Sequence, residues 1–174
     1  MNERGLLTIA CGKSLYLNMA SALARSFRVW HDGDDVTLSI ATDAPKRFPA
    51  DVQDDSNVQF IDISTQNFEE GFENKLHIDK LLPAQRTLFI DADCLLTGPL
   101  DSVFEAFNGR SVSVAGGKSE GEWFGDLRAR CKRFGVSSVH LPVFVGAVYY
   151  VENDETARQV FDTARDVRDQ YDEA

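Results

Sequence analysis

The sequence has no long hydrophobic run and few cysteines. No stretch approaches the roughly 18 apolar residues that a membrane span needs, and residues 1–12 lack the layout of a secretory signal. We therefore expect no transmembrane segment. The three cysteines, Cys11, Cys94 and Cys131, are odd in number and far apart. That pattern favours reduced thiols in the cytoplasm over a disulfide framework or a zinc site.

Basic residues are also scarce. The chain has 18 Lys and Arg against 28 Asp and Glu, which gives a net charge of −10 and a pI near 4.7. A protein with this excess of negative charge is not expected to bind nucleic acid non-specifically. It can still bind an anionic ligand where a metal ion, a lysine or a helix N-terminus supplies local positive charge.

Apolar runs alternate with amphipathic segments along the chain, and its 174 residues suit one domain, residues 1–174. The pattern predicts strands at Gly5–Ala10, Val36–Ala41, Val58–Ile63, 87–91, Ser111–Ala115 and Pro142–Val151. It predicts helices over residues 15–27, about 72–82, Asp101–Phe107, Trp123–Phe134 and the last segment, from Ala157 to Tyr171. A glycine-rich loop is expected from Gly116 to Gly121.

This order predicts an α/β fold in which helices flank a mainly parallel, Rossmann-like sheet. Ligands of such sheets bind beyond the carboxyl ends of the strands. Those ends lie at residues 10–12, 42–43 and 91–93. We expect them to converge on one crevice.

The most informative segment is the apolar run Leu88–Ile90, which is followed by Asp91 and Asp93. The nearest basic residue downstream is Arg110, so the two carboxylates are predicted to be unneutralised. In an extended segment, residues i and i+2 project to the same side. Two carboxylates there suit Mn²⁺ or Mg²⁺, which would stabilise negative charge on a phosphate leaving group. A D-x-D is also a common turn or helix cap, and that interpretation stays open.

Two other motifs of phosphate chemistry are excluded by spacing. Haloacid-dehalogenase-like phosphatases need Thr two residues after the second Asp, where this chain has Leu95. A P-loop needs a glycine five residues before Gly12, where this chain has Leu7. The Gly12 segment is better explained as a plain turn between a strand and a helix.

Several segments together resemble the GT-A-fold glycosyltransferases, most closely the glycogenin-like and galactosyltransferase-like members of glycosyltransferase family 8. They are Lys75-Leu76-His77, Leu81-Leu82, Leu88 to Leu96 with its D-x-D, and Leu100-Asp101-Ser102-Val103-Phe104. The strand and helix from Thr8 to Ser26 and the strand from Phe144 to Tyr149 add weaker similarity. The resemblance covers residues 7–151, which is most of the chain.

The resemblance implies a role for each matching position. Asp91 and Asp93 would bind Mn²⁺ or Mg²⁺ with the diphosphate of a nucleotide-sugar, a UDP-sugar above all, and Lys75 would contact its sugar or phosphate. Tyr16 would stack on the base, and Asp43 would reach the base or ribose. From the residues alone, Tyr16 is equally a core tyrosine, Asp43 a turn residue and Lys75 a solvated lysine. The implied nucleotide-sugar-binding residues are Ala10, Cys11, Tyr16, Asp43, Lys75, Asp91, Ala92, Asp93, Gly146 and Ala147.

The chain also departs from the family pattern. Val145 stands where the family has Asn, and Ala147 stands where it has a second glycine. The family's metal-binding histidine and acceptor-side carboxylate lie in a further C-terminal segment, whereas this sequence stops after its last helix. His31, His77 and His140 are not placed to replace that ligand. One alternative is that a second copy of the chain, a partner chain or a longer gene product supplies it.

Two functions follow as expectations. The first is a metal-dependent glycosyltransferase that moves a sugar from a nucleoside-diphosphate-sugar donor to an unknown acceptor, with retention of configuration by analogy with the family. No catalytic residue can be named for it. The alternative is a non-catalytic nucleotide-sugar-binding or scaffold domain that has lost the acceptor-side segment.

Overall fold

The computed structural model describes residues 2–31, 36–65, 71–118, 127–133, 135 and 142–172. The chain divides into two compact units, one of Met1–Ser113 with Ala147–Ala174 and the other of Val114–Gly146. The single domain predicted for residues 1–174 stays a prediction, because a compact unit is not by itself an independently folding domain.

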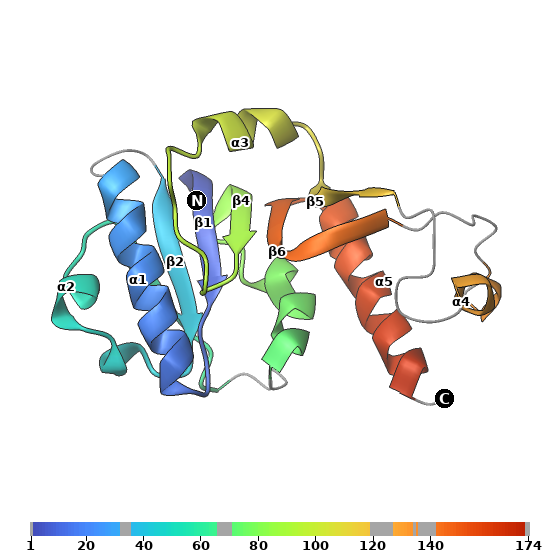
Figure 1. The fold of residues 1–174 in the computed structure, drawn as a ribbon, viewed down its shortest axis with the longest axis horizontal. Coiled ribbons are helices and arrows are strands. Elements are labelled where there is room, and N and C mark those ends of the chain that lie inside the picture. The colour runs from blue at the N-terminus through green and yellow to red at the C-terminus, as the bar shows by residue number, and fades with distance from the viewer. Residues whose placement is uncertain are drawn as a thin grey trace. The chain divides into compact units, whose positions relative to one another are not determined.

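The described strands form one six-stranded sheet in the order β3-β2-β1-β4-β6-β5 (Figure 1). They are β1 (Asn2–Ile9), β2 (Thr37–Thr42), β3 (Val58–Asp62), β4 (Ala84–Ile90), β5 (Val112–Lys118) and β6 (Pro142–Glu152). β1 pairs in parallel with β2 and with β4, and β2 pairs in parallel with β3. β6 runs antiparallel to β4. The predicted α/β fold with a mainly parallel sheet is confirmed.

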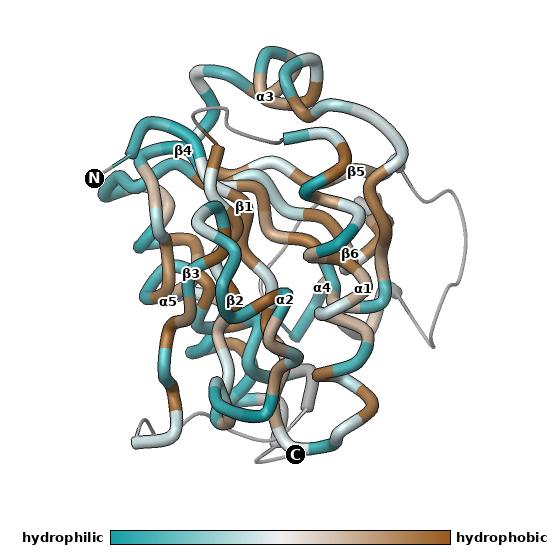
Figure 2. Tube along the Cα trace, turned by 90° about the vertical axis from the view of Figure 1, so that its left-hand side faces the viewer, coloured by the Kyte–Doolittle hydropathy of each residue, from teal (hydrophilic) through white to brown (hydrophobic). Residues whose placement is uncertain are grey.

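Helices cover both faces of the central strands. On one face, α1 (Ser14–Trp30), α2 (Ala50–Gln53) and α3 (Asp101–Phe107) pack on a core that includes Leu6 and Leu88. On the other, η2 (Gly71–Lys80) and α5 (Glu155–Asp172) pack on a core that includes Leu7 and Phe89. Successive side chains of a strand point to opposite faces, so β1 and β4 must be apolar at consecutive positions. Figure 2 shows hydrophobic stretches, in brown, running along these strands.

The segment before β4 differs from the prediction in type and in length. The helix expected at 72–82 is a 3₁₀ helix, η2, and β4 begins at Ala84, directly after Pro83. β1 also begins earlier than predicted, at Asn2, which pairs with Ala84. Pairing between β1 and β4 therefore extends both strands into polar residues, which a search for apolar runs does not identify as strand.

The predicted loop from Gly116 to Gly121 is partly wrong. β5 continues through Gly116 and Gly117 to Lys118. A Cβ at Gly116 would lie 2.3 Å from the carbonyl oxygen of Val143, so only glycine permits this close approach to β6. Residues 119–121 lie outside the described residues, as do parts of the helix predicted at Trp123–Phe134, of which α4 (Leu127–Arg133) is described.

Candidate functional site

A pocket of about 300 Å³ lies at the carboxyl ends of β1 and β4. Its walls are formed by Ile9, Cys11, Tyr16, Met19, Asn74, Lys75, Phe89, Asp91, Ala92 and Asp93. They come from β1 and the loop after it, from α1, from η2, and from β4 and the turn after it. The predicted convergence of the strand ends at residues 10–12 and 91–93 is thus observed. The end of β2, with Asp43, does not line the pocket.

Asp91 and Asp93 lie in a tight turn rather than in an extended segment. β4 ends at Ile90, the Asp91 N–H donates to the carbonyl oxygen of Ala147 (3.0 Å), and the Cys94 N–H donates to that of Asp91 (3.1 Å). The prediction of an extended D-x-D is wrong, because this turn reverses the chain directly after the strand. Both aspartates nevertheless line the same pocket.

Lys75 lies against Asp91. Its Nζ is 2.7 Å from the Asp91 carboxylate and 5.8 Å from the centre of the Phe89 ring. The prediction that both carboxylates are unneutralised is therefore wrong for Asp91. The compensating charge comes from Lys75, which lies sixteen positions before Asp91, so the residues next to the D-x-D give no sign of it. Within the described part of the chain, Asp93 forms no ion pair, and it is exposed.

The two carboxylates make the pocket floor electronegative. Burial, followed by the charges of Asp93 and Asp91, raises the pKa of the Cys94 thiol. Burial, with the charge of Asp91, raises the pKa of the Tyr149 hydroxyl. Cys94 is therefore protonated at neutral pH, and the thiol is less reactive than the thiolate.

Asn74 is a pocket residue that the sequence reasoning missed. It is 3% exposed, and its Nδ2 donates to Cys11 Sγ (3.1 Å). Its Oδ1 is buried and has no hydrogen-bond partner among the described residues. The only signal in the sequence was its position next to Lys75, because an isolated Asn carries no pattern of its own.

The remaining predicted site residues have mixed positions. Tyr16 lines the pocket and is 41% exposed, which excludes a core tyrosine. Ala10 is fully buried and packs in the core beneath α1, so it does not line the pocket.

Asp43 accepts a hydrogen bond from the Gly12 N–H (3.1 Å) and so braces the loop between β1 and α1. Ala147 supports the turn at Asp91 through its carbonyl oxygen. Gly146 belongs to the unit Val114–Gly146 and is not one of the residues that line the pocket.

Neither of the two histidines that the structure describes lines this pocket. His31 is 1% exposed and accepts a hydrogen bond from the Leu100 N–H at Nε2 (3.2 Å), while His77 contacts Lys80. His140 lies outside the described residues. Among the residues that the structure describes, no group of three or more His, Cys, Asp or Glu side chains is arranged to hold a metal ion. The donor set of Asp91 and Asp93 still fits a hard cation whose remaining ligands are phosphate and water oxygens.

Comparisons with known proteins identify the fold. No protein-family profile matches the sequence, and no curated protein is significantly similar to it. The solved structure of the apo glycosyltransferase GlyE of Streptococcus pneumoniae matches with a TM-score of 0.62 and 14% identity, over 97% of this chain and 39% of that one. The galactosyltransferase LgtC, in complex with donor and acceptor sugar analogs, matches with a TM-score of 0.62 and 14% identity, over 97% and 65%. Mouse xyloside xylosyltransferase 1 matches with a TM-score of 0.51 and 13% identity, over 87% and 67%.

The chain therefore has the Rossmann-like GT-A fold of these glycosyltransferases. It spans 39% of the length of GlyE and 65% of that of LgtC. None of its described helices is long and apolar enough to cross a membrane.

Proposed function

We propose that this chain is a glycosyltransferase domain of the family 8 type, which binds a nucleoside-diphosphate-sugar with Mn²⁺ or Mg²⁺ and transfers the sugar to an acceptor with retention of configuration. The cysteine pattern favours a cytoplasmic location. The observation that carries the proposal is the meeting of Asp91, Asp93 and Lys75 in one pocket at the carboxyl ends of β1 and β4. This is the part of an open α/β sheet where nucleotides bind.

Each residue of the pocket has a distinct task in this proposal. Asp91 and Asp93 would hold the cation, which when bound stabilises negative charge on the diphosphate. Lys75 offers a positive charge to the same diphosphate, and Asp91 keeps it at the pocket wall. The exposed ring of Tyr16 offers a flat surface for the base.

A non-catalytic nucleotide-sugar-binding or scaffold domain is the second candidate. It is favoured by the absence, among the described residues, of a third protein ligand near Asp91 and Asp93. The glycosyltransferase and the nucleotide-sugar-binding form of the second candidate both require the nucleotide to bind, whereas a scaffold domain does not. Hydrolysis of a UDP-sugar, or transfer of its sugar, by the purified chain would eliminate the second candidate.

Titration calorimetry with UDP, GDP and CDP, with and without Mn²⁺, tests the shared requirement. We expect at least one nucleotide to bind in a metal-dependent manner and EDTA to abolish the binding. If none of the three binds in the presence of Mn²⁺, the glycosyltransferase and the nucleotide-sugar-binding domain are both wrong, and only the scaffold domain is left.

Replacing Lys75 with Met is expected to weaken UDP binding by roughly 10- to 100-fold, because a charged hydrogen-bond donor is lost. Binding of uridine, which has no phosphate, should change little. Lys46→Met, at an exposed lysine outside the pocket, is the matched control. An equal loss of affinity for UDP and uridine would contradict a role of Lys75 at the phosphates.

A further inference from the structure

The wall of the pocket that carries Asn74 and Lys75 is intrinsically weak. Both residues lie in η2, a 3₁₀ helix of ten residues, Gly71–Lys80. Runs of 3₁₀ helix beyond three or four residues are uncommon because their hydrogen bonds are poorly aligned. The position of η2 must therefore depend on contacts with other elements. Part of that support is Ile78, which is fully buried in the core shared with α5.

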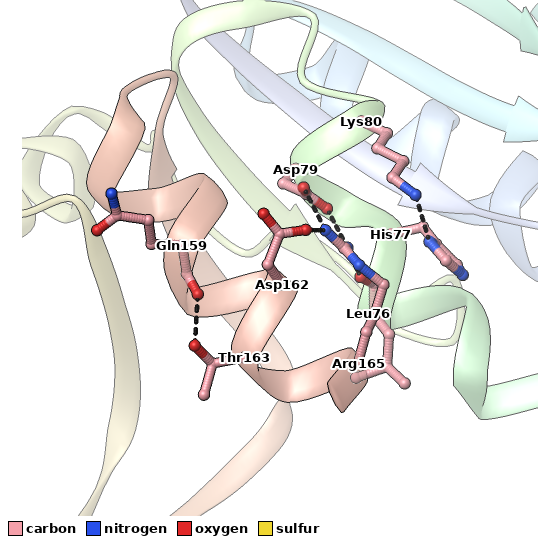
Figure 3. A network of polar contacts seen from close by, with 8 residues as sticks. All are labelled: Leu76, His77, Asp79, Lys80, Gln159, Asp162, Thr163 and Arg165. Carbon is pink, nitrogen blue, oxygen red and sulfur yellow. Dashed lines mark hydrogen bonds and ion pairs between the residues drawn. The ribbon is translucent and has the colours of Figure 1, made fainter. Parts of the chain in front are cut away.

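One side chain of α5 binds η2 at two points, as Figure 3 shows. Arg165 donates two parallel hydrogen bonds to the Asp79 carboxylate, at 2.8 and 3.0 Å, and a third to the carbonyl oxygen of Leu76. The side chains of Arg165 and Asp79 are only 13% and 6% exposed. Asp162, one helical turn earlier in α5, accepts from the same guanidinium at 2.5 Å. Hydrogen bonding to Asp79 raises the pKa of Arg165, so this guanidinium is protonated at physiological pH.

A second arginine of α5, Arg168, binds η2 at the residue that precedes Asn74 and Lys75 in the chain. Arg168 donates to Glu73 Oε2 at 3.0 Å. Glu73 precedes Asn74 in the chain, whereas Leu76 follows Lys75, so α5 brackets the two pocket residues. The bracket adds to the apolar packing of Ile78 against α5, and removing one partner of a buried ion pair is strongly destabilising.

We propose that Arg165 is a positioning residue of the pocket, which tethers η2 to α5 and thereby holds Asn74 and Lys75 in the pocket wall. The part of the proposal that concerns ligand affinity rests on the nucleotide-binding function proposed above. The tether itself does not. Arg165 would act on a bound diphosphate only through Lys75, whose Nζ lies 2.7 Å from Asp91.

Arg165→Met tests the tether directly by hydrogen–deuterium exchange. We expect exchange of the amides of Gly71–Lys80 to accelerate by about tenfold or more, while β1 and β4 keep their protection. Arg158→Met is the matched control, because Arg158 lies on the same helix, is half exposed and contacts Glu155 and Asn153. Unchanged exchange in η2, or equal acceleration in η2 and the central strands, would overturn the proposal.

The binding arm compares UDP with Mn²⁺ and uridine. With Arg165→Met we expect the affinity for UDP to fall by about tenfold and that for uridine by less than about twofold, because Lys75 serves the phosphates. A merely structural defect would lower both affinities equally, and that result would overturn the proposal. If the wild-type chain binds no nucleotide, the proposed function fails while the exchange measurement still decides the tether.

Two further variants protect the test against a misfolded protein. Arg165→Lys keeps the charge but cannot form the bidentate pair, so we expect exchange rates in η2 between those of the wild type and Arg165→Met. Asp79→Asn removes the other half of the pair, and we expect it to accelerate exchange in η2 as Arg165→Met does. If neither variant alters exchange in η2, the tether is not formed by this ion pair.

Discussion

Asp93→Asn is expected to abolish metal-dependent nucleotide binding, with a loss of affinity of about 100-fold or more. Asp91 shares its charge with Lys75, whereas Asp93 is exposed and forms no ion pair in the described part of the chain. Asp93 is therefore the carboxylate whose full charge is available to a cation. Asn keeps the shape and one oxygen but removes that charge, and hard cations depend on it.

The stability of the fold should hardly change in Asp93→Asn, because no contact that holds the fold is removed. Calorimetric titration of UDP in the presence of Mn²⁺ measures the binding, and thermal unfolding without ligand measures the stability. Asp54→Asn, at an exposed aspartate at the end of α2 and outside the pocket, removes the same charge as a control. Metal-dependent binding that survives in Asp93→Asn would exclude this carboxylate as a ligand.

The order of the elements could be predicted because the central strands are buried on both faces. Leu6 and Leu7 belong to different cores, so β1 is visible as an uninterrupted apolar run. The first residues of β1 and β4 were missed for the opposite reason. Asn2 and Ala84 are held in their strands by pairing with each other, and polar or small residues give no periodic signal. The antiparallel direction of β6 depends on its partner β4, and apolar content does not encode it.

The site was predicted where chemistry is carried by adjacent residues and missed where it is made by folding. The D-x-D is a local pattern, and its position at the end of β4 was found. The ion pair between Lys75 and Asp91 joins η2 to the turn after β4, and the burial of Asn74 depends on packing around η2. Neither has a local signal. The tether from Arg165 is further removed still, since it joins residues 86 positions apart.

Phe104→Ala is expected to lower the free energy of unfolding by about 3–5 kcal/mol, the usual cost of deleting a buried aromatic side chain. Phe104 is fully buried. The centre of its ring lies 6.4 Å from that of Tyr150 in an edge-to-face arrangement, and the Arg4 guanidinium lies 5.5 Å from the centre of the Phe104 ring. α3 has seven residues and no side-chain cap at its N-terminus, so local interactions alone cannot hold it. Phe104 is the buried side chain of α3, and the stacking of Phe107 on Tyr150 and the ion pair of Asp101 with Arg4 add to the attachment of the helix.

The loss of stability in Phe104→Ala is expected to be much larger than the loss caused by a substitution at an exposed residue. A melting temperature lower by roughly 10 °C is expected for a chain of this length. Phe104→Leu should cost much less, since it leaves a smaller cavity. Val29→Ala, at a side chain that is 74% exposed on α1, should change the stability by less than about 0.5 kcal/mol. Because Phe104 does not line the pocket, folded Phe104→Ala should still bind UDP with Mn²⁺. Loss of that affinity in the folded variant would mean that the core around Phe104 supports the pocket.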